Sequence, residues 1–293
     1  MIEKHRINLL NFIMKNLLFI FLITFLSFSC DRDTDFLITI STPFGDMKAI
    51  LYDETPRHKE NFISLAKEGK YDSTIFHRII KEFMVQGGDI NQKPGHEGSI
   101  DYTVPAEFVP GYFHKKGALA AARQADKVNP KKASSGSQFY VVHGKVWDEV
   151  ELTTDLNQLN AAIGVLIRLP EYDSIGKVLI DTYTAGDYEG YNKMVLDLRP
   201  AVEERLGRDV SKKIVPERLA VYTTLGGAAW LDDAYTVFGE VVEGLDVIDK
   251  IAAVQTGTAD KPLEDIYMTV SVEEMPKKKI TKLYGFEYPA KEE

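Results

Sequence analysis

The sequence predicts a mainly β protein, a closed or sandwiched antiparallel sheet, that carries an inserted block of helices. Two observations lead to this fold class. Short segments of alternating apolar and polar residues, separated by glycine-rich turns, recur along residues 36–143 and again after residue 220. Between them, in residues 144–219, apolar residues recur every three or four positions, which is typical of helices. Because β segments flank the helical block on both sides, we expect one discontinuous β domain with an insertion.

The first part of the β domain is expected to contain one helix among its strands. This helix follows the second strand, with Thr55 as its N-cap and Pro56 at its first position. Its apolar residues share one face, and Gly69 ends it. The strands of this part are predicted at residues 36–42, 47–52, 74–80, 83–89, 117–122 and 137–142.

The insertion is expected to contain several helices, because Pro170, Gly186 and Pro200 interrupt its helical spacing. The alternating pattern typical of strands resumes after the insertion. The β domain is completed by a strand at residues 235–242, a helix at residues 244–253 and a strand at residues 267–272.

Composition and charge restrict the function. The chain is 44% hydrophobic and 27% charged, which is ordinary for a globular protein. Its net charge of -9 argues against a general nucleic-acid binder, which would need clustered cations. The lysines at residues 277–279 lie in a charged tail, residues 274–293, and are interpreted as solvated surface. An aromatic patch at residues 284–288 of this tail can pack back on the body of the protein.

The N-terminal 30 residues have the pattern of an export signal. A mostly apolar run at residues 16–29 follows basic residues and ends at Cys30, the single cysteine of the chain. This leader resembles bacterial lipoprotein signals, which implies that Cys30 is lipidated and that residues 31–35 form a polar tether. The expected location is the cell envelope, on the periplasmic or surface face of a bacterial outer membrane. A cleaved signal without a lipid, which gives a soluble periplasmic protein, and an uncleaved anchor helix are the alternatives.

Four motifs carry a family resemblance. They are FHRIIKEFMVQGGD at residues 76–89, GALAAAR at residues 117–123, SSGSQFYVV at residues 134–142 and WLDDAYTVFGEVVEGLDVID at residues 230–249. In this order they resemble the cyclophilin-type peptidyl-prolyl cis-trans isomerases. The resemblance implies an eight-stranded antiparallel β-barrel capped by two helices, formed by residues 36–143 and 220–273, with a proline-binding groove on its outer surface.

The resemblance also implies the catalytic group. Arg78 aligns with the catalytic arginine of the family, and Gln86 aligns with a glutamine that binds both this arginine and the substrate. A guanidinium suits the reaction, because the prolyl nitrogen becomes a hydrogen-bond acceptor only when the peptide bond twists. Strand alternation predicts that Arg78 shares a face with Phe76 and Ile80.

The remaining site residues are carried over in the same way. The proline pocket corresponds to Phe83, Met84, Tyr140 and Leu231, with Tyr235 where the family commonly has histidine. Tyr140 replaces a phenylalanine, so its hydroxyl needs a polar or hydrated end to the pocket. The substrate-backbone groove corresponds to Ala122, Gln138 and Arg123, the last in place of an asparagine whose contact is made through backbone atoms. Trp230 matches the tryptophan associated with cyclosporin binding.

We therefore expect an isomerase that acts on X–Pro bonds of exported proteins and assists their folding. Its partners are proline-containing polypeptides, with cyclosporin as a further candidate ligand, a membrane reached through the lipid anchor, and no nucleic acid. No cofactor or metal is expected, and His77 is interpreted as structural. The alternative is a binding module or chaperone that holds proline-containing segments and uses the helical insertion to recognise partners.

Overall fold

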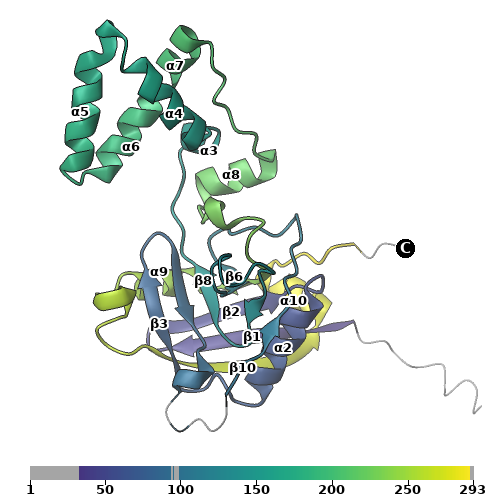
Figure 1. The fold of residues 1–293 in the computed structure, drawn as a ribbon. Helices are drawn as coiled ribbons and strands as arrows, with labels where there is room; N and C mark the ends of the chain where they lie inside the picture. Colours follow the sequence, from purple (N-terminus) through teal and green to yellow (C-terminus); the bar gives the residue numbers. More distant parts are fainter. Residues whose placement is uncertain (1–32, 94, 96–98, 291–293) are drawn as a thin grey trace, which may run out of the picture.

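The computed structural model describes residues 33–93, 95 and 99–290 and contains a closed antiparallel barrel (Figure 1). Around the barrel the strands follow the order β1-β10-β3-β4-β8-β6-β9-β2. The eight-stranded barrel expected from the family resemblance is thus confirmed. The strands are β1 (Thr34–Thr42), β2 (Gly45–Leu51), β3 (Thr74–Ile80), β4 (Met84–Gly87), β6 (Ala118–Ala121), β8 (Phe139–Val142), β9 (Val237–Glu243) and β10 (Tyr267–Pro276).

The barrel core is shared by the strands and two helices, α2 (Pro56–Lys67) and α9 (Leu245–Ala252). The apolar face predicted for the first helix is confirmed, since Phe62 of α2 is buried among barrel residues, as is Ile251 of α9. Each large apolar side chain buried in this way contributes about 1.5–3 kcal/mol. Shorter elements complete the domain, namely β5 (Thr103–Val104), β7 (Ser134–Ser135), η1 (Ile90–Gln92), η3 (Ala229–Leu231) and η4 (Thr258–Asp260).

Strand β3 contains a bulge that changes which side chains face outward. Phe76 pairs with Gly87 of β4 and Arg78 pairs with the next residue, Gln86, so His77 is an extra residue on β3. Phe76 is therefore fully buried in the barrel core while Arg78 lies on the outer face. The prediction that Phe76 shares a face with Arg78 was wrong, because simple alternation does not hold across a bulge.

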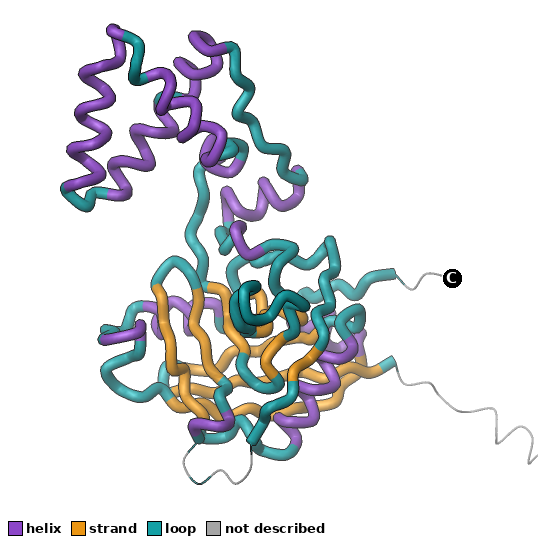
Figure 2. The backbone as a smooth tube through the Cα atoms, in the orientation of Figure 1, coloured by secondary structure: helices purple, strands orange, loops and turns teal. Residues whose placement is uncertain are grey.

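The predicted insertion is helical, and most of it stands clear of the barrel (Figures 1 and 2). Its outer part has a core of its own, in which Leu159, Leu179, Val195 and Val202 are buried. This outer bundle consists of α4 (Leu156–Leu166), η2 (Pro170–Tyr172), α5 (Asp173–Thr184), α6 (Tyr188–Asp197) and α7 (Arg199–Leu206).

Two further helices, α3 (Glu149–Leu152) and α8 (Pro216–Thr224), join the insertion to the barrel. Tyr222 of α8 is fully buried against Phe113, which belongs to the barrel domain. Helix α8 thus crosses the predicted boundary between residues 219 and 220. Nearby, the backbones of Lys145 and Gly227 exchange hydrogen bonds of 2.9 and 3.2 Å.

The outer bundle is connected to this base by two chain segments that lie side by side. Thr154 and Ser211 form an antiparallel bridge, and the Asp155 amide donates to the Val210 carbonyl oxygen at 2.8 Å. The chain therefore enters and leaves the outer bundle at the same place, next to α3 and α8.

Both ends of the barrel domain differ from the predicted boundaries. Strand β1 begins at Thr34, and Asp35 is buried in an ion pair with Lys59 at 2.6 Å, so the predicted tether loses two residues. At the other end, β10 runs to Pro276 and α10 (Lys277–Tyr284) follows it. Lys277 is not a solvated tail residue, because it binds Asp53 at 2.7 Å.

The aromatic patch of the tail does pack back, since Phe286 is buried and its ring stacks with the ring of Tyr52. Within the described part of the chain, no helix is long and apolar enough to cross a membrane. The predicted leader and Cys30 lie outside the described residues.

We expect the outer bundle to be removable. Replacing residues 156–209 by an Asn-Gly turn that joins Asp155 to Val210 should leave a folded barrel, because the bundle buries its own core and Asp155 already forms a backbone hydrogen bond with Val210. Circular dichroism and thermal unfolding measure this. A longer deletion of residues 145–218 should unfold at a clearly lower temperature, because it removes Trp147 and part of α8. Equal stability of the two variants would contradict this division of the insertion.

Candidate active site

A row of side chains crosses the outer face of four neighbouring strands. Arg78 of β3 is paired with Gln86 of β4, which is paired with Tyr140 of β8, which is paired with Ala120 of β6. Neighbouring strands lie about 4.8 Å apart, so roughly 10 Å separates the backbones of Arg78 and Tyr140. The structure therefore brings together, on one surface, a cation and an apolar floor that are 62 residues apart in sequence.

Arg78 is held at its Nε atom. This nitrogen donates to the Asp260 carboxylate at 3.3 Å, and both side chains are more than 40% exposed. An arginine has five N–H donors. Asp260 is its one partner among the described residues, which leaves the N–H groups of both terminal nitrogens available at the surface.

Gln86 and Gln138 form a hydrogen-bonded chain next to Arg78. The Gln86 amide donates to the Gln138 side-chain oxygen at 3.0 Å, and Gln138 donates in turn to Asp89 at 3.0 Å. The contact between Gln86 and the arginine that the resemblance implied is replaced here by the contact with Gln138. The orientation of both amides is fixed by Asp89, which can only accept.

The predicted proline-pocket residues gather in one apolar cluster. Met84, Tyr140 and Leu231 are at most 8% exposed and form its buried part, with Phe83 and Tyr235 packed against them. The rings of Tyr140 and Tyr235 meet edge to face, with their centroids 6.2 Å apart. The cluster contains Ala122 as well. The predicted pocket residues thus share one apolar cluster on the outer face that also carries Arg78.

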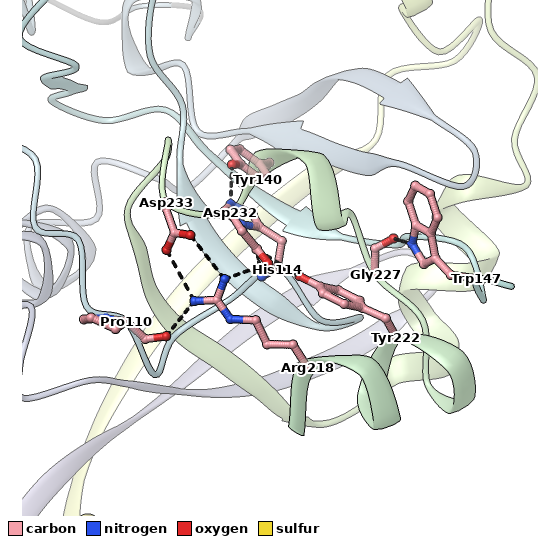
Figure 3. Close-up of polar contacts among 9 residues, drawn as sticks. All are labelled: Pro110, His114, Tyr140, Trp147, Arg218, Tyr222, Gly227, Asp232 and Asp233. Carbon is pink, nitrogen blue, oxygen red and sulfur yellow. Dashed lines mark hydrogen bonds and ion pairs between the residues drawn. The ribbon is translucent and has the colours of Figure 1, made fainter. Parts of the chain in front are cut away.

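The Tyr140 hydroxyl has the polar partner that the sequence required. It lies 3.0 Å from Nε2 of His114, a fully buried residue (Figure 3). Burial raises the pKa of Tyr140 well above its ordinary value, so the hydroxyl keeps its proton. His114 was missed by the sequence analysis, because no spacing or motif links residue 114 to residue 140.

Arg123 turns its charge away from the groove. Its guanidinium lies over the Tyr235 ring at 4.2 Å and binds the Ala234 carbonyl oxygen and Asp126. The side chain is only 4% exposed. Arg123 therefore packs against Tyr235, which lies next to the predicted pocket residues.

Trp230 forms an exposed rim. Its side chain is 50% exposed, and its ring lies 5.3 Å from that of Phe83 and 5.5 Å from that of Trp147. Trp147 lies in the segment that leads into the insertion, and the sequence analysis did not identify it. The apolar rim thus continues from the pocket toward the inserted helices.

Metal chemistry has no candidate site in the described residues, which contain no group of three or more His, Cys, Asp or Glu side chains able to hold an ion. His77 lies on the bulge beside Arg78, and its Nδ1 atom is buried without a hydrogen-bond partner. Burial lowers the pKa of His77, so this imidazole is neutral near pH 7.

Comparison with known proteins gives one family. The sequence pattern of the cyclophilin-type peptidyl-prolyl cis-trans isomerases matches residues 37–178 and 220–272. A Staphylococcus haemolyticus protein named as a peptidyl-prolyl cis-trans isomerase is 30% identical over 83% of this chain and 94% of its own length.

Two further proteins that match this chain also carry peptidyl-prolyl cis-trans isomerase in their names. A Streptococcus pyogenes protein named as a bifunctional phosphatase and peptidyl-prolyl cis-trans isomerase is 31% identical over 78% of this chain, which spans 37% of that relative's length. The crystal structure of a Cryptosporidium parvum cyclophilin-type isomerase matches 82% of this chain and 98% of its own, with a TM-score of 0.48 and 18% identity. Because the family pattern covers more than half of the chain and reaches all eight strands of the barrel, this protein belongs to the cyclophilin-type peptidyl-prolyl cis-trans isomerases.

Proposed function

We propose that this chain isomerises X–Pro bonds in exported polypeptides and so assists their folding, with Arg78 as the catalytic group. The observation that carries the proposal is the position of Arg78, an exposed guanidinium on the same outer face as a buried apolar cluster. The family membership supports the reaction, and the export signal pattern supports the class of client.

The reaction needs little chemistry. Rotation about an X–Pro bond has a barrier of about 18–20 kcal/mol, because the nitrogen lone pair is conjugated with the carbonyl group. In the twisted state this lone pair is free to accept a hydrogen bond. A terminal N–H of Arg78 aimed at it stabilises the twisted state more than either planar state, which is the condition for acceleration.

The pocket supplies the other half of the reaction. Met84, Tyr140 and Leu231 hold the prolyl ring, while the Gln86–Gln138 chain offers polar groups to the substrate backbone. With the ring held, rotation moves the residue that precedes proline. Trp230 at the exposed rim is the residue on which cyclosporin binding would depend.

Arg78→Ala should lower kcat/KM for a proline-containing tetrapeptide by at least about 100-fold, as expected for the loss of one preorganised donor. Exchange rates measured by NMR with and without protein give this value. Arg168→Ala, which removes an exposed arginine of the insertion, is the matched control and should leave the rate unchanged. If folded Arg78→Ala were as active as Arg168→Ala, Arg78 would not be the catalytic group.

We propose as a second function that the insertion binds client chain next to the proline. A cleft of about 1060 Å³ lies between α6 and the barrel, and Glu82, the neighbour of Phe83, lines it. The ion pairs of Lys145 with Glu151 and of Lys193 with Asp197 balance part of its charge. The other carboxylates that line it, Glu82, Asp148 and Glu189, leave the cleft acidic, which favours a cationic client segment.

The variant in which an Asn-Gly turn replaces residues 156–209 tests this second function, because it removes α6 and keeps the predicted pocket residues. It should isomerise a tetrapeptide as fast as the complete chain. Its kcat/KM for an unfolded client with lysines next to the proline should fall about fivefold, while a client with glutamates there should show little change. Equal losses for both clients would contradict recognition by the acidic cleft.

We further propose that the protein is anchored in the cell envelope through a lipid on Cys30. The cysteine ends the apolar run of residues 16–29, and β1 begins four residues later, which leaves the barrel close to the anchor. Several acyl chains together hold a protein firmly, at about 0.8 kcal/mol per buried methylene. A soluble periplasmic form is the alternative.

Fractionation of the cells that naturally make this protein tests the anchor. The natural protein should be found with the membranes, and Cys30→Ser should move to the soluble fraction or remain unprocessed without a lipid label. A second variant, Ser29→Ala, is the control and should stay with the membranes. The anchor proposal would fail if Cys30→Ser distributed as the natural protein does and both lacked an acyl label.

A further inference from the structure

A continuous chain of polar contacts connects the proline pocket with the base of the insertion (Figure 3). It begins at the Tyr140 hydroxyl, passes through both nitrogens of His114 to the Asp232 carboxylate, and ends on α8 at Tyr222 and Arg218. The distances are 3.0 Å from Tyr140 to His114, 3.0 Å from His114 to Asp232, 2.8 and 2.9 Å from Tyr222 to the two carboxylate oxygens, and 3.2 Å from Arg218 to Asp232.

The ionisation state of Asp232 decides where the proton between it and His114 lies. Burial alone would raise the pKa of Asp232, but hydrogen bonds from His114 and Tyr222 outweigh it and hold this pKa below its ordinary value. The ionised carboxylate can only accept, so Nδ1 of His114 carries a proton and donates to it. Nε2 of His114 lies within hydrogen-bond distance of the Tyr140 hydroxyl, which can donate or accept. Every polar group of the chain is satisfied in this arrangement.

The contacts are buried, and so they are strong enough to fix positions. His114 and Tyr222 are fully buried, and the side chains of Asp232 and Arg218 are 10% and 14% exposed. Hydrogen bonds to charged groups are stronger than those between neutral groups. Arg218 also reaches Asp233 at 3.3 Å and the Pro110 carbonyl oxygen at 2.6 Å, so α8 holds two loops of the barrel at once.

Asp232 also lies in the pocket wall. It follows Leu231 in sequence, and the Ala228 amide donates to the His114 carbonyl oxygen at 2.8 Å. The segment that presents Trp230 and Leu231 is therefore fixed at one end to His114 and at the other to α8. A shift of α8 would move both the wall at Leu231 and the floor at Tyr140.

We infer that Arg218 and Tyr222 are positioning residues for the proline pocket, and that the insertion sets the pocket's shape through helix α8, Asp232 and His114. This inference rests on the proposed isomerase function. It divides the insertion by role. Helix α8 is part of the machinery that binds proline, whereas the outer bundle, α4 to α7, is not connected to the pocket by this chain of contacts.

A double-mutant cycle on the complete chain tests the inference. Arg218→Met removes the charge at one end, and Tyr140→Phe removes the hydroxyl at the other. Each should raise KM for a proline-containing tetrapeptide about fivefold with little change in kcat, because prolyl-ring binding is shared by the ground and twisted states. If the two ends are coupled, the double variant should be no worse than the worse single variant.

Tyr222→Phe is a milder variant, which keeps the packing of the ring and removes one hydroxyl, and it can replace Arg218→Met in the cycle if that variant does not fold. Val202→Ala, in the core of the outer bundle, is the control: it should lower stability and leave KM unchanged. The inference would be overturned if the double variant raised KM by the product of the two single-variant factors. It would also be overturned if Val202→Ala raised KM as much as the single variants at Arg218 (or Tyr222) and Tyr140 do. Absence of isomerase activity in the unmodified chain would instead remove the proposed function itself.

Discussion

Closure of the barrel is the constraint on which the rest of the structure depends. In a closed antiparallel barrel each strand must send alternate side chains into a core with no open edge, so the remaining side chains are committed to the outer surface. Val85, Phe139 and Val141 fill the core, and Gln86, Tyr140 and Ala120 are thereby placed in one outer row. The site is the outer face of the strands whose inner face makes the core.

The bulge at His77 is a departure from this alternation that the site requires. In a regular strand Phe76 and Arg78 would point the same way, and with Phe76 in the core the guanidinium would be buried without a counterion, at high cost. The extra residue in β3 turns Arg78 outward, where Asp260 meets it. The bulge therefore allows an aromatic core residue and an exposed cation to lie two residues apart. In a regular strand, residues two apart lie on the same face.

Much of this arrangement could be predicted from the sequence, and the part that could not has a physical reason. The strands and the helix beginning at Pro56 follow local patterns of two and 3.6 residues, and the predicted pocket residues do gather in one cluster. The bulge has no such pattern, since FHRII reads as plain alternation. The contacts of Tyr140 with His114, and of Asp232 with Tyr222, depend on how loops pack in three dimensions, and a period within one segment carries no information about that.

The place of the insertion explains why its base became part of the pocket. It connects β8 to β9, and both strands border the site: β8 carries Tyr140, and the chain entering β9 carries Leu231 and Asp232. Its two ends approach so closely that a Cβ atom on Gly144 would lie 2.3 Å from the Cα atom of Gly227. The helix that ends the insertion is therefore held close to this wall, and α8 packs against it with Tyr222 and Arg218. The bundle beyond the Thr154–Ser211 bridge is free of this constraint, because its own core stabilises it and only two chain segments lead to it.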